Sequence, residues 1–266
     1  MDAAGVRRYN AAMRSLLTAV LLAFASSASA QDMMRGLDMT SPDMTMAEMS
    51  RADVEAVIRA AAGKPLDLTG KRLSGLDLSN LDLHGAIFRA ARLNHANLAH
   101  ANLDGAVLDQ AWALEADFSG ASLVGASLFQ AQLQKARFDG ADFSHARIAA
   151  DFSGARLNGA ILRGANGAAD EKNQSMGLMR ASFKSADLAG ADFSGADLSR
   201  ADLSFAKCAG ADFAGARLRD ADASGADLRG AKLADVTAPG LDLDSARLDP
   251  GVTISGAAHA ERAVRN

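Results

Sequence analysis

The sequence lacks most of the residues that build disulfide frameworks or aromatic sites. Its 266 residues include one cysteine, one tryptophan, one tyrosine and four prolines. The single cysteine, Cys208, excludes an internal disulfide. Neither sign of charge is in large excess, because the formal net charge is −4, and this balance gives no support to nucleic-acid binding. Stability must therefore come from aliphatic packing, and function from local features of the chain.

Long apolar runs are also missing, apart from one near the N-terminus. Three arginines precede the run "SLLTAVLLAFASS", and a small-x-small site ending at Ala30 follows it. This order is typical of a cleaved secretory signal, and the run is too short for a comfortable transmembrane helix. We predict a signal peptide over residues 1–30, cleavage after Ala30, no membrane span in the mature chain, and a periplasmic or secreted protein.

The dominant pattern is a five-residue repeat, as in "ADLAGADFSGADLSRADLS" at 186–204. A period of five fits neither a strand nor a helix, so it indicates a repeat architecture. About 34 units cover residues 66–250, with one four-residue unit at 146–149 and a non-repeat loop at 166–180. A small residue opens most units and Leu, Phe or Ile follows two positions later, an alternation that can pack closely along an interior line.

This pattern resembles the A(D/N)LXX repeat of the pentapeptide-repeat family. The resemblance implies an all-β fold, a right-handed quadrilateral parallel β-helix in which four units form one coil. The central residue of each unit and the residue two before it would point inward. A solenoid of about 8 coils, roughly 40 Å long, is then expected.

The segments outside the repeat have separate predicted roles. Residues 31–44 are predicted to be a flexible Met-rich linker, and residues 45–65 a capping α-helix that covers the first coil. Thr45 and Glu48 match the capping-box pattern at a helix start, and the following apolar residues recur at helical spacing. The C-terminal tail, 251–266, is expected to cover the other end.

Reactive side chains do not gather at catalytic or metal-ligand spacing, so we expect a protein that is not an enzyme and has no cofactor. Asp202, Asp222 and Asp242 lie 20 residues apart and should form one outward column. We expect each of these carboxylates to hydrogen-bond its own turn rather than a cation.

Two departures from the repeat are candidate protein-binding features. The first is an outward apolar group formed by Trp112, Leu114 and Val107, with Ile87 expected to stack on Val107. The second is the loop at 166–180, because extra residues in a solenoid leave it as loops that commonly bind. Local shielding of the apolar group and a neutral insertion stay open as alternatives. The candidate contact residues of the loop are Asp170, Glu171, Lys172, Asn173, Gln174, Met176 and Met179.

The favoured interpretation is a scaffold or binding surface for an unknown envelope protein, as a monomer or an end-to-end dimer, without a nucleic-acid partner. An alternative is copper binding or copper tolerance, because the thioethers of Met44, Met46 and Met49 suit Cu(I). Those methionines could equally pack on the first coil. The quinolone-resistance members of the family imitate duplex DNA and bind gyrase, but the predicted export and the outward arginines disfavour that role here.

Overall fold

The computed structural model describes residues 38–61, 63–169 and 179–265. The chain divides into two units, Met1–Thr40 and Ser41–Asn266, and the fold described is that of the second. The predicted signal peptide and most of the predicted linker lie outside the described residues. No helix in the described ranges is long and apolar enough to span a bilayer. The elements are α3 (Pro42–Thr45), α4 (Arg51–Ala61), β1 (Arg247–Leu248), the 3-10 helix η2 (Ala260–Arg262) and β2 (Val264–Arg265).

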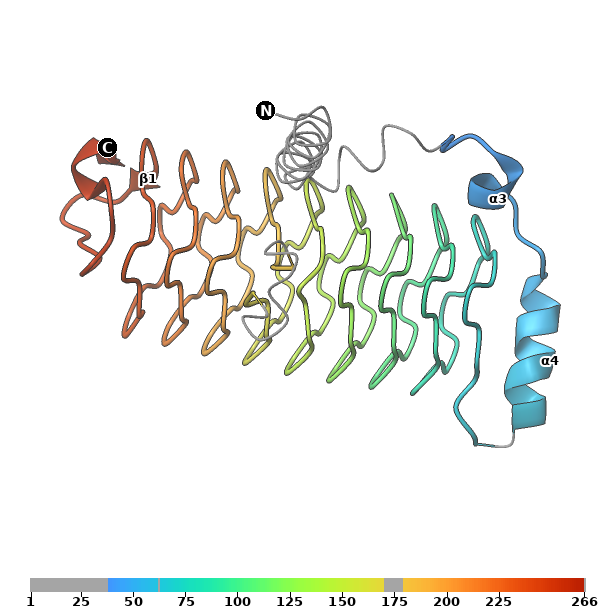
Figure 1. Cartoon of the computed structure of the whole chain (residues 1–266). Coiled ribbons are helices and arrows are strands. Elements are labelled where there is room, and N and C mark those ends of the chain that lie inside the picture. Colours follow the sequence, from blue (N-terminus) through green and yellow to red (C-terminus); the bar gives the residue numbers. More distant parts are fainter. Residues whose placement is uncertain (1–37, 62, 170–178, 266) are drawn as a thin grey trace, which may run out of the picture. The chain divides into compact units, whose positions relative to one another are not determined.

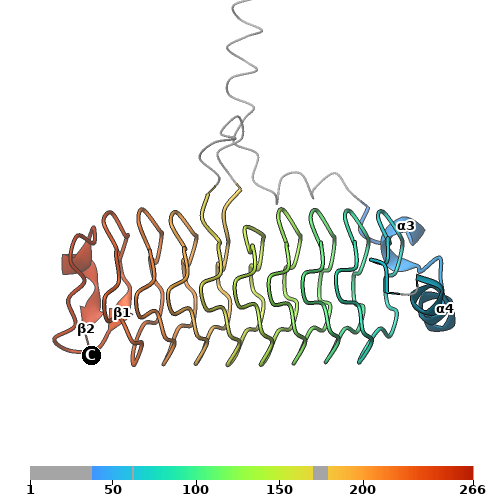
Figure 2. The same cartoon turned by 90° about the horizontal axis from the view of Figure 1, so that it is seen from below.

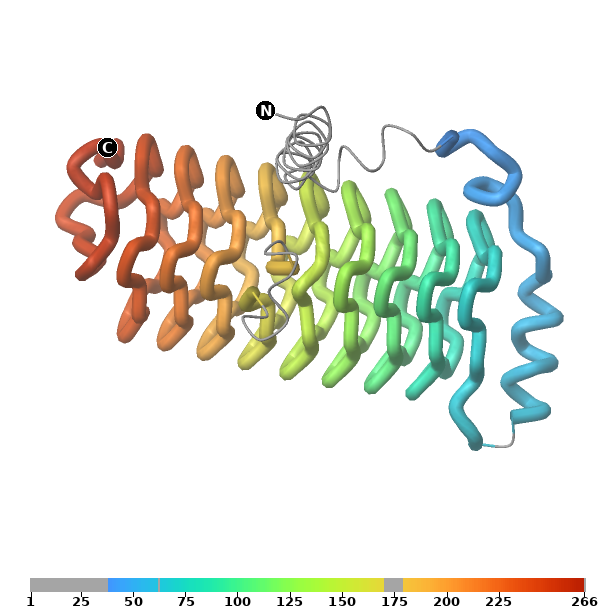
Figure 3. The backbone as a smooth tube through the Cα atoms, viewed as in Figure 1, coloured from blue at the N-terminus to red at the C-terminus, as the bar shows by residue number. Residues whose placement is uncertain are grey.

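The second unit is a parallel β-helix, in which successive coils stack along one axis (Figures 1 and 3). Parallel bridges join residues 20 apart, and the predicted pair of Ile87 with Val107 is one of them. Four bridges recur in each coil, so four ladders run along the solenoid. We name them after one coil: ladder 1 passes through Val107, ladder 2 through Trp112, ladder 3 through Asp117 and ladder 4 through Ser122. Each five-residue unit thus supplies one bridge and one turn.

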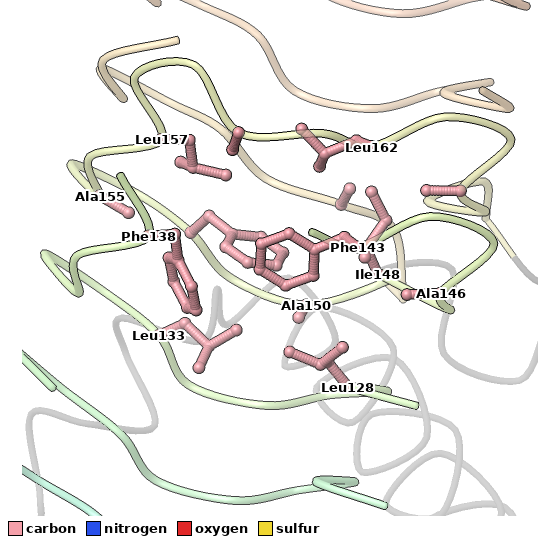
Figure 4. Close-up of a cluster of buried hydrophobic side chains, with 14 of the residues drawn as sticks. Leu128, Leu133, Phe138, Phe143, Ala146, Ile148, Ala150, Ala155, Leu157 and Leu162 are labelled. Carbon is pink, nitrogen blue, oxygen red and sulfur yellow. The ribbon is translucent and has the colours of Figure 1, made fainter. Parts of the chain in front are cut away.

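The core is a continuous line of buried alanine, leucine and phenylalanine side chains. Phenylalanine rings stack from coil to coil, with centroids 4.8 Å apart for Phe118 and Phe138 and 5.1 Å apart for Phe152 and Phe183. Figure 4 shows Phe138 and Phe143 inside the coils, among leucine and alanine side chains. The alternation of small and large inward residues is what lets this interior close-pack.

The polar residue before each central position stabilises the turn that follows. Asp202, Asp222 and Asp242 each accept a hydrogen bond from the backbone N–H two residues later, at 2.9 Å. These three residues are also bridged to one another along ladder 2. The predicted column and the predicted turn role are both confirmed.

The helix before the repeat begins at Arg51 rather than at Thr45. The capping box is formed by Ser50 and Asp53, whose carboxylate accepts the Ser50 backbone N–H at 2.8 Å. The predicted start was wrong because Glu48 serves the solenoid instead. Its N–H donates to the carbonyl of Arg72 at 2.9 Å, and this bond holds the chain extended along the first coil.

Helix α4 lies across the N-terminal end of the stack (Figures 1 and 2). Val54 is fully buried in the core cluster. The Arg51 guanidinium donates to the carbonyls of Asp77 and Ser79, each at 3.1 Å. In the interior of the solenoid, carbonyls at these positions accept N–H groups from the preceding coil. Arg51 therefore supplies the donors that a preceding coil would have supplied.

The four-residue unit at 146–149 tightens one turn without interrupting any ladder. Arg147 pairs with Asn166, and Gln132 pairs with Asp151, in both cases 19 residues apart. The Ala150 N–H donates to the carbonyl of Ile148 at 2.8 Å, a bond that spans one residue fewer than the regular turn bonds. The missing residue is therefore taken from the turn and not from the strand.

The C-terminal tail extends only two of the four ladders. Ala258 bridges to Asp242 on ladder 2, and β2 pairs in parallel with β1 on ladder 3. Within the described residues, ladder 4 ends at Lys232 and ladder 1 ends at Thr237. The tail is therefore a partial coil.

Candidate interaction edge

The insertion leaves the solenoid at the turn that the four-residue unit shortens one coil earlier. Ala181 donates its N–H to the carbonyl of Gly167 at 2.8 Å, and Ala150 makes the equivalent 2.8 Å bond to Ile148. The predicted loop start at 166 was too early, because Asn166 still bridges to neighbouring coils on both sides in ladder 1. The inserted chain thus lies inside this turn, between the two residues that its closing hydrogen bond joins.

Side chains of the turns between ladders 1 and 2 connect the C-terminal stem of the insertion with coils that precede it in the sequence. In this column the Gln110 amide donates to the Gln130 amide oxygen at 3.0 Å. The Gln130 amide nitrogen in turn lies 2.6 Å from the Met179 sulfur. The unit at 146–149 has only four residues, so it has no fifth residue to continue the row of side chains formed by Gln110 and Gln130. Met179, at the C-terminal stem of the insertion, reaches across that coil instead.

The predicted apolar group lies beside the same column of turns. Val107 precedes the Gln110 turn on ladder 1, Trp112 follows it on ladder 2, and Leu114 lies in the next turn, between ladders 2 and 3. All three side chains are half-buried rather than freely exposed. Trp112 is bridged between Arg92 and Gln132, so its neighbours along the ladder shield part of it.

We define the interaction edge as Val107, Trp112, Leu114, Gln130 and Met179. Its two ends are separated by more than 60 residues in the sequence. Val107, Trp112, Gln130 and Met179 flank or lie on one column of turns, in which Gln110 and Gln130 are one coil apart, and Leu114 lies in the next turn, between ladders 2 and 3. The other six predicted loop residues, Asp170, Glu171, Lys172, Asn173, Gln174 and Met176, lie outside the described residues.

Amide groups and one carboxylate line the edge on the ladder 2 side. The Gln134 amide donates to the Gln132 side-chain oxygen at 2.9 Å and to Asp151 at 2.7 Å. On the ladder 1 side, the Arg147 guanidinium lies 3.7 Å from the centre of the Phe129 ring. The edge therefore combines aromatic, aliphatic and amide surface, a composition that suits protein contacts.

Sequence reasoning missed two outward aromatic residues. Phe129 occupies a fourth position of its unit and Phe205 a fifth position, and neither position faces the core. Phe205 is 60% exposed, the largest exposure of any aromatic side chain among the described residues. Comparing each aromatic residue with its place in the five-residue frame would have found both.

The methionines of the copper hypothesis lie in three different environments. Met44 is buried, Met49 packs partly against the core, and Met46 is 60% exposed. The Met44 carbonyl also accepts the buried Asn94 amide at 3.1 Å, which ties this segment to ladder 2. Packing against the solenoid thus explains the positions of Met44 and Met49. Cu(I) binding stays a prediction, which a competition titration with Met→Ile variants would test.

Reactive groups do not converge in the described part of the chain. No group of three or more His, Cys, Asp or Glu side chains there is placed to hold a metal ion. Cys208 is inward-facing, and burial raises the pKa of its thiol to about 12. This thiol is therefore a small apolar core group at neutral pH.

The comparisons with known proteins agree with this geometry. The profile of the family described as Pentapeptide repeats matches in 8 copies, over residues 67–94, 114–148, 148–168, 178–207, 196–235 and 211–249. These matches cover more than half of the sequence, and the chain belongs to the pentapeptide-repeat family. No curated protein matches it.

Solved structures of the same family resemble the chain. HetL, a pentapeptide repeat protein involved in heterocyst differentiation regulation from the cyanobacterium Nostoc sp. strain PCC 7120, is 28% identical, with a TM-score of 0.47. The match covers 82% of this chain and 93% of HetL. A trypsin-treated form of QnrB1, a plasmid-mediated fluoroquinolone resistance protein, is 21% identical over 70% of this chain and 88% of that chain, with a TM-score of 0.53.

The QnrB1 likeness shows the fold, which is a right-handed β-helix. Proteins of this family are generally structural or binding proteins rather than enzymes. The described residues contain no arrangement that would argue for catalysis in this member.

Proposed function

We propose that the mature chain is an exported, non-enzymatic scaffold that binds another envelope protein through the interaction edge. In this proposal residues 1–30 are removed after Ala30, and the protein works in the periplasm or outside the cell. Its four-sided solenoid of about eight coils, capped by α4, holds the edge rigid. The signal-like N-terminus supports the location, and the lack of convergent reactive groups supports a binding role.

One observation carries the proposal. Val107 and Trp112 flank the Gln110 turn, and the described stems of the insertion, Ala169 and Met179, belong to the same column of turns. A row of side-chain contacts, from Gln110 to Gln130 and from Gln130 to Met179, runs along this column. Independent neutral irregularities would have no reason to share one of the four columns of turns.

The test requires a loop-free protein that still folds, and the sequence provides its design. Removing residues 169–180 joins "ANGA" to "ASFKS", the same layout as "ARIA" followed by "ADFSG" one coil earlier. Because Ala181 already bonds to Gly167 as Ala150 does to Ile148, the join needs little movement. We expect this deletion to change the free energy of unfolding by less than about 1 kcal/mol.

The binding measurement is photo-crosslinking in the periplasm, with the crosslinker placed at Trp112 or at Met179. We expect the same partner from both positions. Crosslinking from position 112 should be lost in the loop-free protein, and crosslinking from position 179 should be lost in Trp112→Ala. Ile161 provides the matched control, since it is a half-buried apolar residue at a bridge position of ladder 4. Different partners from the two positions, or equal capture from Ile161, would contradict the proposal.

A further inference from the structure

Helix α4 buries one face and leaves the opposite face open. Val54 is fully buried and Ile58 packs against the core, so this side of the helix rests on the first coil. Successive residues of an α-helix are about 100° apart, so Ala56, two positions from both of them, points directly away from the core. Among the labelled elements, α4 is also the outermost one at this end of the stack (Figures 1 and 2).

The open face is apolar along its centre and charged only at its margins. Val57, which is 38% exposed, lies on one side of the central row, and Glu55 and Arg59 lie on the other side. Asp53, on the Val57 side, is held at the start of the helix by Ser50. The central row consists of three exposed alanines that are one turn apart, Ala52, Ala56 and Ala60.

This face is complementary to itself in an antiparallel pair. A two-fold axis beside Ala56 brings the Ala56 residues of two copies together and sets Ala52 of each copy opposite Ala60 of the other. Because Ala56 is the middle residue of α4, the two helices then overlap along their whole length. The two Val57 side chains meet on one side of the contact.

The charges at the margin favour a second copy over other partners. In the antiparallel pair, Arg59 of each copy comes within one helical turn of Glu55 of the other, so each charge meets one of opposite sign. A partner whose surface carries a single sign of charge would be repelled by one of these two residues. Glu55 also pairs with Arg51 of its own helix, at 2.8 Å, which holds its carboxylate near the margin.

We propose that the outer face of α4 binds the same face of a second copy, which joins two solenoids at their N-terminal ends. The alanines let the helix axes approach closely, and Val57 gains burial. The exposed ion pairs add little affinity but fix direction and register. This site is separate from the interaction edge and does not depend on it.

The contact is small, so the dimer should be weak. A helix of 11 residues is about 16 Å long, and one of its faces offers less than the about 800 Å² per partner of a standard interface. We expect a Kd on the order of 100 μM. The mature protein should therefore be monomeric near about 1 μM and mostly dimeric near about 500 μM.

Cysteine crosslinking of the mature protein tests the register, because the only natural cysteine, Cys208, is buried. We expect Ala56→Cys to form disulfide-linked dimers at least tenfold faster than Ala52→Cys or Ala60→Cys alone, since only position 56 meets itself at the two-fold axis. An equimolar mixture of Ala52→Cys and Ala60→Cys should crosslink as fast as Ala56→Cys. Another preferred pair, or equal crosslinking of all variants, would overturn the proposal.

A charge exchange followed by sedimentation velocity tests the margin. Arg59→Glu and Glu55→Arg should each weaken the dimer at least fivefold, because each places like charges together across the contact. Their equimolar mixture should recover the wild-type affinity, since opposite charges then meet again. Near about 1 μM, where the monomer predominates, substitution of Arg59 should leave the stability of α4 unchanged. Unchanged affinity of Arg59→Glu, or no recovery in the mixture, would overturn the proposal.

Ala56→Glu is the second variant, should Glu55→Arg fail to fold without its pair to Arg51. Because Ala56 is exposed, this change should abolish association and leave the fold intact. Val264→Glu is the matched control, since Val264 is 40% exposed at the other end of the solenoid, and it should associate as the wild type does. A wild type that stays monomeric at about 500 μM, or loss of association in Val264→Glu, would overturn the proposal. Slow maleimide labelling of monomeric Ala56→Cys would overturn it too, because the chain would then cover the face itself.

Discussion

At the scale of single residues, the turns decide which side chains the repeat tolerates. The fifth residue of a unit has a positive φ, which glycine adopts without strain. Where a larger residue occupies this position, it leans over the turn of the next coil. Phe205 covers Gly225 in this way, and a Cβ at Gly225 would lie 2.7 Å from the Phe205 ring. Phe205 thus requires glycine at position 225, whereas Gln110 is followed by Gln130 without such a clash.

We predict that Gly225→Ala destabilises the protein more than Gly195→Ala does. Both positions have a positive φ, but nothing lies within 4 Å of a Cβ at Gly195. The strain of the backbone should cost about 1 kcal/mol at either site, and displacement of Phe205 should add about 1 kcal/mol at Gly225. Urea unfolding measures the difference. The excess should disappear in a Phe205→Ala background, and an excess that persists there would refute the proposed contact.

Cys208 gives a prediction with a pH dependence. Burial raises the pKa of its thiol to about 12, so the folded state favours the protonated form. The resulting stability is complete below the ordinary thiol pKa, and it is lost as the pH rises toward the folded value. Between pH 8 and pH 10.5 the wild type should lose more stability than Cys208→Ala. Thiol reagents at pH 8 should modify the wild type only after unfolding, and rapid labelling of the native protein would contradict this account.

At the scale of elements, the N-terminal cap depends on one arginine. Arg51 donates to two carbonyls of the first coil and also pairs with Glu55 on α4, with 2.8 Å between Arg51 Nε and the carboxylate. A lysine could not supply both donors in the same plane. The arginine fork thus joins the helix to two residues of ladder 3.

We predict that Arg51→Ala costs about 1 to 2 kcal/mol and that Arg51→Lys recovers less than half of this loss. The effect should be local, with faster amide exchange in α4 and in the first coil and little change beyond residue 110. Arg59→Ala serves as the control on the same helix, because Arg59 is exposed. A uniform loss of protection along the whole solenoid would show that the cap is not a local element.

At the scale of the whole molecule, the solenoid is a one-dimensional stack whose turn carboxylates act together. Hydrogen bonds from nearby groups lower the pKa of several of them. The pKa of Asp77 is lowered by Ser79, that of Asp212 by the Ala214 N–H and Lys232, and that of Asp242 by the Asp244 N–H and His259. Each carboxylate prefers to be charged in the folded state.

We predict an acid transition that begins near pH 4. A carboxylate with a lowered pKa contributes stability above its unfolded pKa, and that stability is lost as the pH falls through the folded value. The urea midpoint should therefore be nearly constant from pH 7 to pH 5 and fall steeply below pH 4. Asp212→Asn should reduce this slope, because its amide oxygen can still accept the Ala214 N–H but does not titrate. A slope unchanged by the substitution would exclude a contribution from Asp212.

The sequence by itself determined the repeat, the parallel coil and the inward lines of alanine and leucine. These follow from contacts between residues at a fixed spacing of 5 or 20, so each unit reports its own environment. The pairing of Ile87 with Val107 and the turn role of Asp202 were accessible for the same reason. The positions of Phe129 and Phe205 were equally encoded in the five-residue frame.

Only the tertiary structure decided how the irregular parts combine. The helix start moved to Arg51 because the Glu48 N–H bonds to a coil that follows it in the chain, which no local pattern reports. Met179 approaches Gln130 beside the turn that the four-residue unit shortens, a contact between segments almost 50 residues apart. The ends of ladder 4 at Lys232 and of ladder 1 at Thr237 depend on where the tail rejoins the solenoid. These outcomes rest on contacts between non-repeating segments, whose spacing the repeat does not fix.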